Sequence, residues 1–356
     1  MSEAQKRIVI AAGGTAGHVT PALAVADALR AEGALVTFVG GERAEAELVP
    51  AAGYPLRTIS VEGLSRDNPL RAARALVRAA GAVHASRALL AELEPHAVMA
   101  GGGYVAGPVG LASLTRRVPL VLTEADSHLG LTNRLLAPLA RRVCLSFEIE
   151  GRIGSRYRVT GRPIPVANAD RAIARERFGI APGELCVLVF GGSLGSRSIN
   201  RAALEAFASG DFHVLHVCGR RDYEECSRAS LRRGYDLREY LDIGEFAQAL
   251  AAADLVVARA GGSVFEIAAY ALPAILVPYP HASGDHQSAN ARWMAQAGAA
   301  IVIADADLSA SRLAREVAQL LANRSRLAAM AGASRRLARP EAAREVAGEL
   351  LEAARR

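Results

Sequence analysis

A β-α-β pattern in the last third of the chain constrains the fold more than any other feature. The apolar run 255–258 is followed by a turn at Gly261 and Gly262, by a short helical pattern, and by a second apolar run at 274–277. Such a unit places two parallel strands in one sheet. Because open parallel sheets bind ligands outside the carboxyl ends of their strands, the glycine turn and the loop after residue 277 are the predicted ligand positions.

The same order of strand, glycine turn and helix opens two further segments. Residues 7–12 precede the turn GGTAGH and a helix expected from about Pro21 to Leu29. Residues 185–190 precede the turn GGSLGS and a helix expected from about Ile199. The repeated opening predicts two related halves.

The length of 356 residues also favours two domains. We predict an α/β fold of two Rossmann-like parallel-sheet domains that face a central cleft. The domains are expected at 1–160 and 166–339, and the linker is expected at 152–165, where glycine and two prolines interrupt the pattern. The segment from residue 311 onward is expected to be helical throughout, and its last helix, about 340–356, to pack back on the first domain.

The composition predicts a globular protein of the cytoplasm. Hydrophobic residues make up 51% and charged residues 22% of the chain. No run approaches the roughly 18 apolar residues of a membrane span, and the N-terminus shows no signal-peptide pattern. The four cysteines lack metal-type spacing, so we expect reduced thiols.

The basic charge comes almost wholly from arginine. The net charge is +6, and Lys6 is the only lysine, which excludes a Walker A lysine or a Schiff-base lysine in the body of the protein. Guanidinium groups suit phosphates and acidic membrane surfaces. Nucleic acid is not expected as a partner, because the arginines are scattered and only 5% of residues are aromatic. The arginines of 69–93 and the pairs at 116–117 and 141–142 fit either a solvated surface or a membrane-facing patch.

Two side chains stand where chemistry is expected. His18 ends the first glycine turn, where it is either a general base or an ordinary capping or surface histidine. Glu266 follows the turn at 261–262, where it either accepts hydrogen bonds from a ribose or only complements the helix dipole. The adjacent Gly13 and Gly14, followed by Thr15, do not fit G-x-G-x-x-G, which argues against NAD.

Five blocks in order resemble the MurG family of bacterial N-acetylglucosaminyltransferases: GGTAGHVTPALAVADAL, GGGYVAGPVGLAS, GLTNRLLAPLA, GGSLGSRSIN and EIAAYALPAILVPYPHASGDHQSANA. The resemblance implies the GT-B fold. It implies transfer of N-acetylglucosamine from UDP-N-acetylglucosamine to the C4 hydroxyl of the undecaprenyl-linked muramyl-pentapeptide, lipid I, giving lipid II for peptidoglycan synthesis. It also implies a peripheral location on the cytoplasmic side of the cell membrane, an anionic membrane surface as partner, and contacts with cell-wall synthesis proteins.

The resemblance assigns roles residue by residue. His18 is the expected base, with Asp126 as its rival, because a carboxylate stands there in place of the family's amide. The expected donor contacts are Thr15, Ala16, Gly17, Asp126, Arg162, Ser193, Ile243, Glu266, Gln287 and Asn290. Arg162 lies three residues before the matched position of the family's linker arginine. No cofactor and no tightly bound metal is expected, since backbone amides at a helix start can stabilise the departing UDP.

Three other functions are weighed against this one. They are a GT-B transferase that acts on another lipid acceptor such as diacylglycerol, a non-catalytic binder of UDP-sugars or lipid intermediates, and, more distantly, a dehydrogenase. The altered block TEAD at 123–126 bears on the first two, because it changes contacts to the sugar or the acceptor.

Overall fold

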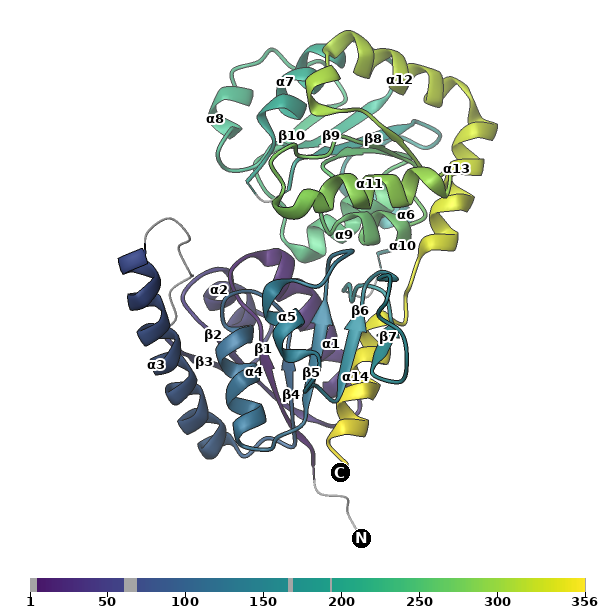
Figure 1. Cartoon of the computed structure of the whole chain (residues 1–356). Coiled ribbons are helices and arrows are strands. Elements are labelled where there is room, and N and C mark those ends of the chain that lie inside the picture. The colour runs from purple at the N-terminus through teal and green to yellow at the C-terminus, as the bar shows by residue number, and fades with distance from the viewer. Residues whose placement is uncertain (1–4, 61–68, 166–168, 193, 356) are drawn as a thin grey trace. The chain divides into compact units, whose positions relative to one another are not determined.

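The computed structural model describes residues 5–60, 69–165, 169–192 and 194–355, with the backbone alone at 69–79 (Figure 1). The chain forms two compact units. The first comprises Met1–Pro165 and Arg339–Arg356, and the second comprises Val166–Ala338. No helix among the described residues is long and apolar enough to cross a membrane.

The first unit is a parallel sheet of seven strands in the order β3-β2-β1-β4-β5-β6-β7. Its strands are β1 (Arg7–Ala11), β2 (Leu35–Gly40), β3 (Leu56–Thr58), β4 (Ala97–Ala100), β5 (Leu120–Glu124), β6 (Arg142–Leu145) and β7 (Tyr157–Val159). Its helices are α1 (Ala16–Ala31), α2 (Ala44–Ala51), α3 (Pro69–Leu93), α4 (Ala106–Thr115), α5 (Leu131–Leu136) and α14 (Ala342–Ala353). The central strand β4 is buried along its whole length, as expected of a parallel strand covered on both faces.

The second unit repeats this topology with six parallel strands in the order β10-β9-β8-β11-β12-β13. Its strands are β8 (Cys186–Phe190), β9 (His213–Val217), β10 (Tyr235–Arg238), β11 (Leu255–Ala258), β12 (Ala274–Leu276) and β13 (Ala300–Val302). Its α-helices are α6 (Arg171–Arg177), α7 (Arg197–Ala206), α8 (Tyr223–Cys226), α9 (Ile243–Ala252), α10 (Val264–Ala269), α11 (His286–Gln296), α12 (Ala310–Ala322) and α13 (Arg324–Leu337). Two short 3₁₀ turns are η1 (Ser283–Asp285) and η2 (Asp305–Asp307).

The prediction of a linker throughout 152–165 was wrong. Strand β7 lies inside that stretch and pairs in parallel with β6, with Val143 opposite Tyr157 and Leu145 opposite Val159. A strand of three residues whose burial is intermediate or low has no long apolar run, so its sequence resembles a loop. The glycines and prolines around it mark the ends of an edge strand.

The C-terminal helix α14 packs against α1 in the first unit (Figure 1). Glu349 of α14 accepts hydrogen bonds from Nε of Arg142 at 2.5 Å and from Nε of Arg158 at 3.1 Å. The Glu349 side chain is only 10% exposed, so this ion pair fastens the helix to β6 and β7. The segment from residue 311, expected to be helical, forms three helices that are divided at Asn323, which caps α13, and before α14, where Pro340 stands.

Candidate functional site

Each sheet reverses its strand order at a glycine turn. The order turns back between β1 and β4 in the first unit and between β8 and β11 in the second. At such a switch point the connections from neighbouring strands leave toward opposite faces of the sheet, which makes room for a ligand at the carboxyl edge. The turns GGTAGH and GGSLGS therefore occupy the same topological position in their two units.

In the first unit the turn runs directly into α1. The helix begins at Ala16, so Gly17 and His18 lie in its first turn and Pro21 lies inside it. The predicted start at Pro21 was wrong. A proline inside a helix has no N–H to donate to the carbonyl four residues earlier, here that of Gly17, and Nη2 of Arg162 donates to this oxygen instead. Arg162, from the segment after β7, thus supports the helix start.

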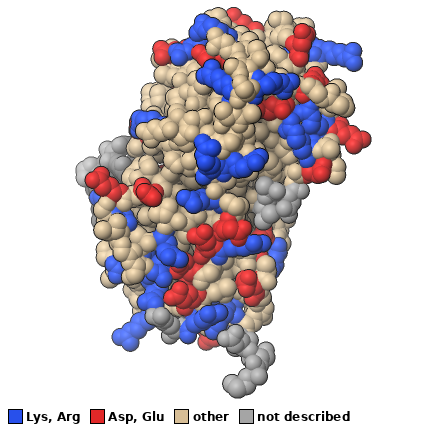
Figure 2. All heavy atoms as spheres, turned by 90° about the vertical axis from the view of Figure 1, so that its right-hand side faces the viewer, with Lys and Arg blue, Asp and Glu red and all other residues tan. Residues whose placement is uncertain are grey.

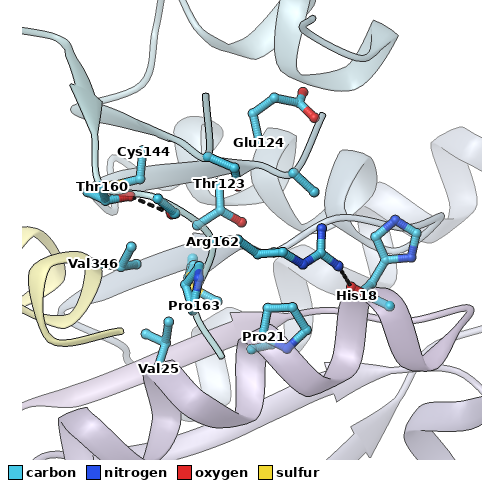
Figure 3. Close-up of a pocket in the computed structure, with 17 residues that line it drawn as sticks. His18, Pro21, Val25, Thr123, Glu124, Cys144, Thr160, Arg162, Pro163 and Val346 are labelled. Carbon is cyan, nitrogen blue, oxygen red and sulfur yellow. Dashed lines mark hydrogen bonds between the residues drawn. The ribbon is translucent and has the colours of Figure 1, made fainter. Parts of the chain in front are cut away.

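His18 is half-buried at the edge of a pocket that the first unit forms (Figure 3). Its Nδ1 lies 3.3 Å from Oγ1 of Thr15, the N-cap residue of α1. Gly102, in the turn after β4, lies so close to the ring that a Cβ there would be 2.7 Å from Cδ2 of His18. Two glycine turns therefore hold the imidazole between them.

The surroundings of His18 favour its neutral form. Burial and the positive charge of Arg162 lower the pKa of His18 below its usual value, against the opposing effect of the carboxylates of Asp126 and Glu45. An imidazole with a lowered pKa is uncharged at pH 7 and can accept a proton. The structure thus gives His18 the protonation state that a general base needs.

Sequence analysis did not single out Glu124, which organises the loop that carries Asp126. Its buried carboxylate accepts hydrogen bonds from the backbone amides of Asp126 at 3.1 Å and Gly130 at 2.9 Å, and from Nδ2 of Asn133 at 2.9 Å. The sequence signal that could have identified Glu124 is its position as an acid at the end of an apolar strand. Asp126 itself is half-buried, and its charge acts on His18.

In the second unit the turn after β8 lies against the turn after β9. A Cβ at Gly195 would be 2.0 Å from the carbonyl oxygen of Cys218, and a Cβ at Gly219 would be 2.3 Å from the amide nitrogen of Gly195. Both glycines also have positive φ, of 79° and 87°, so a side chain at either position is excluded. Ser193, the predicted phosphate contact in this turn, lies outside the described residues.

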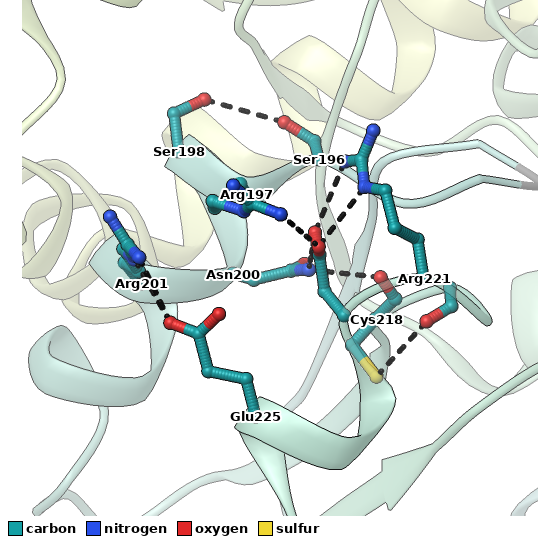
Figure 4. A network of polar contacts seen from close by, with 10 residues as sticks. Ser196, Arg197, Ser198, Asn200, Arg201, Cys218, Arg221 and Glu225 are labelled. Atoms are coloured by element: carbon teal, nitrogen blue, oxygen red, sulfur yellow. Dashed lines mark hydrogen bonds and ion pairs between the residues drawn. The ribbon is translucent and has the colours of Figure 1, made fainter.

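A chain of buried polar side chains supports α7 behind this turn (Figure 4). Nδ2 of Asn200 donates to the carbonyl of Cys218 at 2.9 Å and to Oδ2 of Asp222 at 3.2 Å, and its Oδ1 lies 3.1 Å from Nε2 of His216. Nδ1 of His216 lies 2.9 Å from Oη of Tyr235. Burial lowers the pKa of His216 to about 4, so this histidine is uncharged at pH 7.

Positive charge gathers where this polar chain reaches the surface. The buried carboxylate of Asp222 pairs with Arg221 at 3.0 Å and with Arg197, the first residue of α7, at 3.4 Å. Both arginine side chains remain about half exposed, at 50% and 56%. Together with the amides of the α7 N-terminus, they make the second glycine turn a favourable place for an anion.

The remaining predicted donor contacts lie at two helix starts. Ile243 is the first residue of α9, which Asp242 caps in a capping box with Glu245. The first amides of a helix lack a partner within the helix, which suits the predicted backbone contact of Ile243 with a base. Glu266 lies in the first turn of α10 and is half-exposed, in the expected place.

Gln287 and Asn290 lie one turn apart on α11. Oε1 of Gln287 accepts from the amide of Tyr279 at 2.9 Å. Asn290 is 3% exposed, and its Nδ2 donates to the carbonyl of Ala260 at 3.0 Å. Sugar contacts of both residues stay predictions. In the structure Asn290 secures the turn after β11, and its Oδ1 has no partner among the described residues.

Two parallel α/β units of matching strand order, each with a glycine turn at its switch point, are the architecture of GT-B glycosyltransferases. Residues 8–145 match the glycosyltransferase family 28 N-terminal domain, and residues 186–346 match the glycosyltransferase family 28 C-terminal domain. Similar curated proteins are named UDP-N-acetylglucosamine--N-acetylmuramyl-(pentapeptide) pyrophosphoryl-undecaprenol N-acetylglucosamine transferase. One from Moorella thermoacetica is 43% identical over 94% of this chain and 96% of its own, and one from Halorhodospira halophila is 42% identical over 96% and 97%.

Solved structures of glycosyltransferases are similar to this chain over nearly its full length. MurG from Acinetobacter baumannii is similar with a TM-score of 0.76 at 29% identity, over 98% of this chain and 99% of that one. CalG4, the calicheamicin glycosyltransferase, shares the fold with a TM-score of 0.70 at 17% identity, over 99% and 97%. The chain therefore belongs to glycosyltransferase family 28 and, within it, to the MurG family.

Proposed function

We propose that the chain transfers N-acetylglucosamine from UDP-N-acetylglucosamine to the C4 hydroxyl of undecaprenyl-pyrophosphoryl-N-acetylmuramyl-pentapeptide, with inversion at the anomeric carbon. The observation that carries the proposal is the 43% identity, over nearly the full length of both chains, to a relative whose name states this donor and acceptor. The product would be lipid II, the precursor used in peptidoglycan synthesis.

The second unit would bind the donor. Glu266 would accept hydrogen bonds from the ribose hydroxyls, the amide of Ile243 would contact uracil, and Gln287 would contact the sugar. The departing UDP carries at least two negative charges, which the amides at the start of α7 and the guanidinium of Arg197 can stabilise without a metal ion. Ser193 would add a contact to the diphosphate.

The first unit would bind the acceptor and take its proton. Attack by a sugar hydroxyl requires removal of its proton as the new bond forms. If Nδ1–H of His18 donates to Oγ1 of Thr15, then Nε2 is left unprotonated and can accept that proton. Burial and the positive charge of Arg162 lower the pKa of His18, and Arg162 also supports the helix start. Its predicted contact with the diphosphate stays a proposal, as do those of Ala16, Gly17 and Asp126.

We also propose that the first unit attaches to an anionic membrane surface on the cytoplasmic side. Leu131, Leu135 and Leu139, at and just after α5, are 53%, 67% and 65% exposed. Leu139 lines a surface groove together with Arg117 and Arg141. Exposed leucines beside arginines suit insertion into the interface of anionic lipid.

The predicted contribution of Arg142 to this surface was wrong, because Glu349 holds its side chain, which is only 17% exposed. The side chains of Arg71, Arg74 and Arg78 lie outside the described part of the chain. On the face shown in Figure 2 basic side chains are interspersed with acidic ones, as expected where arginines form ion pairs.

Liposome co-sedimentation tests the membrane proposal. Binding should rise with anionic lipid and fall with salt, and Leu135→Ser should weaken it. Ile173→Ser provides the control, since Ile173 is 64% exposed on the second unit. Equal loss of binding in both variants, or equal binding to neutral vesicles at every salt concentration, would contradict this assignment.

Transfer of radiolabel from UDP-N-acetylglucosamine tests the catalytic proposal. The purified chain should label lipid I and leave diacylglycerol unlabelled in a parallel reaction. Labelling of diacylglycerol alone would assign another acceptor, and UDP binding without any transfer would indicate a non-catalytic relative.

A further inference from the structure

Glu45, which sequence analysis passed over, is a fully buried acid beside the first glycine turn. It is the second residue of α2, and its relative exposure is 0%. Its carboxylate accepts three hydrogen bonds: from the amide of Gly14 at 2.7 Å, from the amide of Gly41 at 2.9 Å and from Oη of Tyr104 at 2.6 Å. These partners lie in the connections after β1, β2 and β4, so one carboxylate joins three turns at the carboxyl edge of the sheet.

The glycines around Glu45 leave the space that its side chain occupies. A Cβ at Gly13 would lie 2.6 Å from Oε1 of Glu45, and a Cβ at Gly40 would lie 2.7 Å from its Cγ. A Cβ at Gly41 would lie 1.9 Å from Oη of Tyr104. Glycine at these positions therefore leaves room for the side chains of Glu45 and Tyr104.

The site requires a carboxylate rather than any polar side chain. Burial alone would raise the pKa of Glu45, but the hydrogen bonds from Tyr104, Gly14 and Gly41 hold it below the usual value. Burial and the hydrogen bond to Glu45 raise the pKa of Tyr104 to about 12, so the phenol keeps its proton and donates it. All three partners are donors. A glutamine would turn an N–H group toward at least one of them.

Two of the three turns that Glu45 joins, those after β1 and β4, also contact His18. Gly14 precedes Thr15, whose hydroxyl lies 3.3 Å from Nδ1 of His18. The turn that carries Tyr104 contains Gly102, which packs on the imidazole, and Gly103, where a Cβ would lie 1.8 Å from the carbonyl oxygen of Gly13. A shift of either turn would therefore move the imidazole.

We propose that Glu45 is a positioning residue for glycosyl transfer, which acts through Gly14 and Tyr104 to fix the imidazole of His18 between the two glycine turns. The inference rests on the proposed function, in which His18 accepts the proton of the acceptor hydroxyl. A base displaced by about 1 Å can lose a factor of about 100 in rate. The negative charge of Glu45 also acts to raise the pKa of His18, against burial and Arg162, which lower it. Asp126 is the other acid that acts to raise it.

The test compares Glu45→Gln with Glu47→Gln in the full chain. Glu47 lies in the same helix and is exposed, so both variants lose one negative charge from α2. Glu45→Gln should lower kcat by about 10- to 100-fold, with the affinity for UDP within about two-fold of wild type. Glu47→Gln should keep both values. Tyr104→Phe removes a single donor without a change of charge and should lower kcat by a smaller factor.

Titration of the His18 ring by NMR, with its signal assigned from His18→Ala, gives a readout that does not depend on turnover. In Glu45→Gln the pKa of His18 should fall below that of wild type and of Glu47→Gln, because a neighbouring negative charge is lost. An unchanged kcat in Glu45→Gln would overturn the inference, whatever the titration shows. If Glu45→Gln does not fold, wild-type kcat in Tyr104→Phe would overturn it.

The outcomes separate the two proposals. If the wild-type chain transfers no sugar, the proposed function fails, whatever the titration shows. If the wild-type chain transfers sugar while Glu45→Gln and Tyr104→Phe match it in kcat, the function stands and the positioning role of Glu45 is wrong.

Discussion

The two glycine turns occupy equivalent positions in their sheets but differ in the charged side chains beside them. The first turn rests on the buried anion of Glu45 and leads into a helix whose first turn carries a neutral histidine. The second turn leads into α7, where Arg197 and Arg221 add positive charge and a neutral His216 lies behind. The backbone arrangement is repeated, and the side chains around it differ.

This difference in charged side chains suits the two turns to different chemistry. A turn backed by an anion suits a group that must gain a proton, because negative charge favours the protonated form that develops. A turn surrounded by guanidinium groups and helix amides suits a diphosphate that gains negative charge as the sugar leaves. We therefore assign proton transfer to the first turn and binding of the donor to the second.

Among the substitutions that test this division of roles, His18→Ala is expected to have the largest effect. His18→Ala should lower kcat by at least about 100-fold, because a placed base contributes about 10²- to 10⁴-fold, while UDP affinity should remain nearly intact. Steady-state kinetics with calorimetry checks both quantities. A His18→Ala variant with near wild-type kcat would remove the first turn from the chemistry.

Glu266 provides the reverse case in the second unit. Glu266→Ala should weaken UDP binding by about 10- to 100-fold, since a hydrogen bond to a charged group contributes about 1.5 to 3 kcal/mol. Calorimetric titration with UDP measures the change, and Glu205→Ala, a matched substitution on α7, is the control. Unchanged UDP affinity in Glu266→Ala would contradict the assignment of the ribose contact.

Asn200 tests whether the polar chain supports the second turn. Asn200→Ala should lower the free energy of unfolding by about 1 to 3 kcal/mol, because Asp222 and His216 each lose a buried hydrogen-bond partner. Urea unfolding followed by circular dichroism measures the loss. Ser227→Ala is the control and should change stability little, because the Ser227 hydroxyl, which donates to the backbone carbonyl of Glu224, is exposed to solvent. Equal stability of Asn200→Ala and wild type would show that the hydrogen bonds of Asn200 make no net contribution to the free energy of unfolding.

The smallest effect is expected at Asp126. Asp126→Asn restores the family's amide and should keep kcat within a few-fold of wild type, because His18 rather than Asp126 is the proposed base. Steady-state kinetics measures kcat for both variants. Loss of activity in Asp126→Asn together with retained activity in His18→Ala would transfer the role of base to Asp126.

The sequence predicted the parallel α/β class well because its strongest signals are local. Apolar runs followed by glycine turns identify β1, β8 and β11, and the pattern after the turn at 261–262 placed Glu266 in the first turn of a helix. Edge strand β7 was missed, since three residues with low or intermediate burial carry no apolar run. The start of α1 was misplaced, because the hydrogen bond from Arg162 to Gly17 joins residues 145 positions apart.

Glu45 and Glu124 were missed for the same physical reason. Both are acids whose importance comes from burial and from amide donors in other turns, which local sequence does not reveal. An acid at the start of a helix or at the end of a strand usually has a simpler explanation. A search for acids beside several glycine-rich turns of one sheet is the pattern that could have found Glu45.

The pH dependence of kcat/KM for the acceptor, in wild type and in His18→Ala, tests the division between the two turns most directly, because kcat/KM reports the pKa values of the free enzyme. A base is active when unprotonated, and burial and Arg162 lower the pKa of His18 from 6.5. The wild-type kcat/KM should therefore be constant near neutral pH and fall with a midpoint below 6.5, and this fall should be absent from the residual kcat/KM of His18→Ala. The same fall in both proteins, or no fall in wild type, would contradict the account.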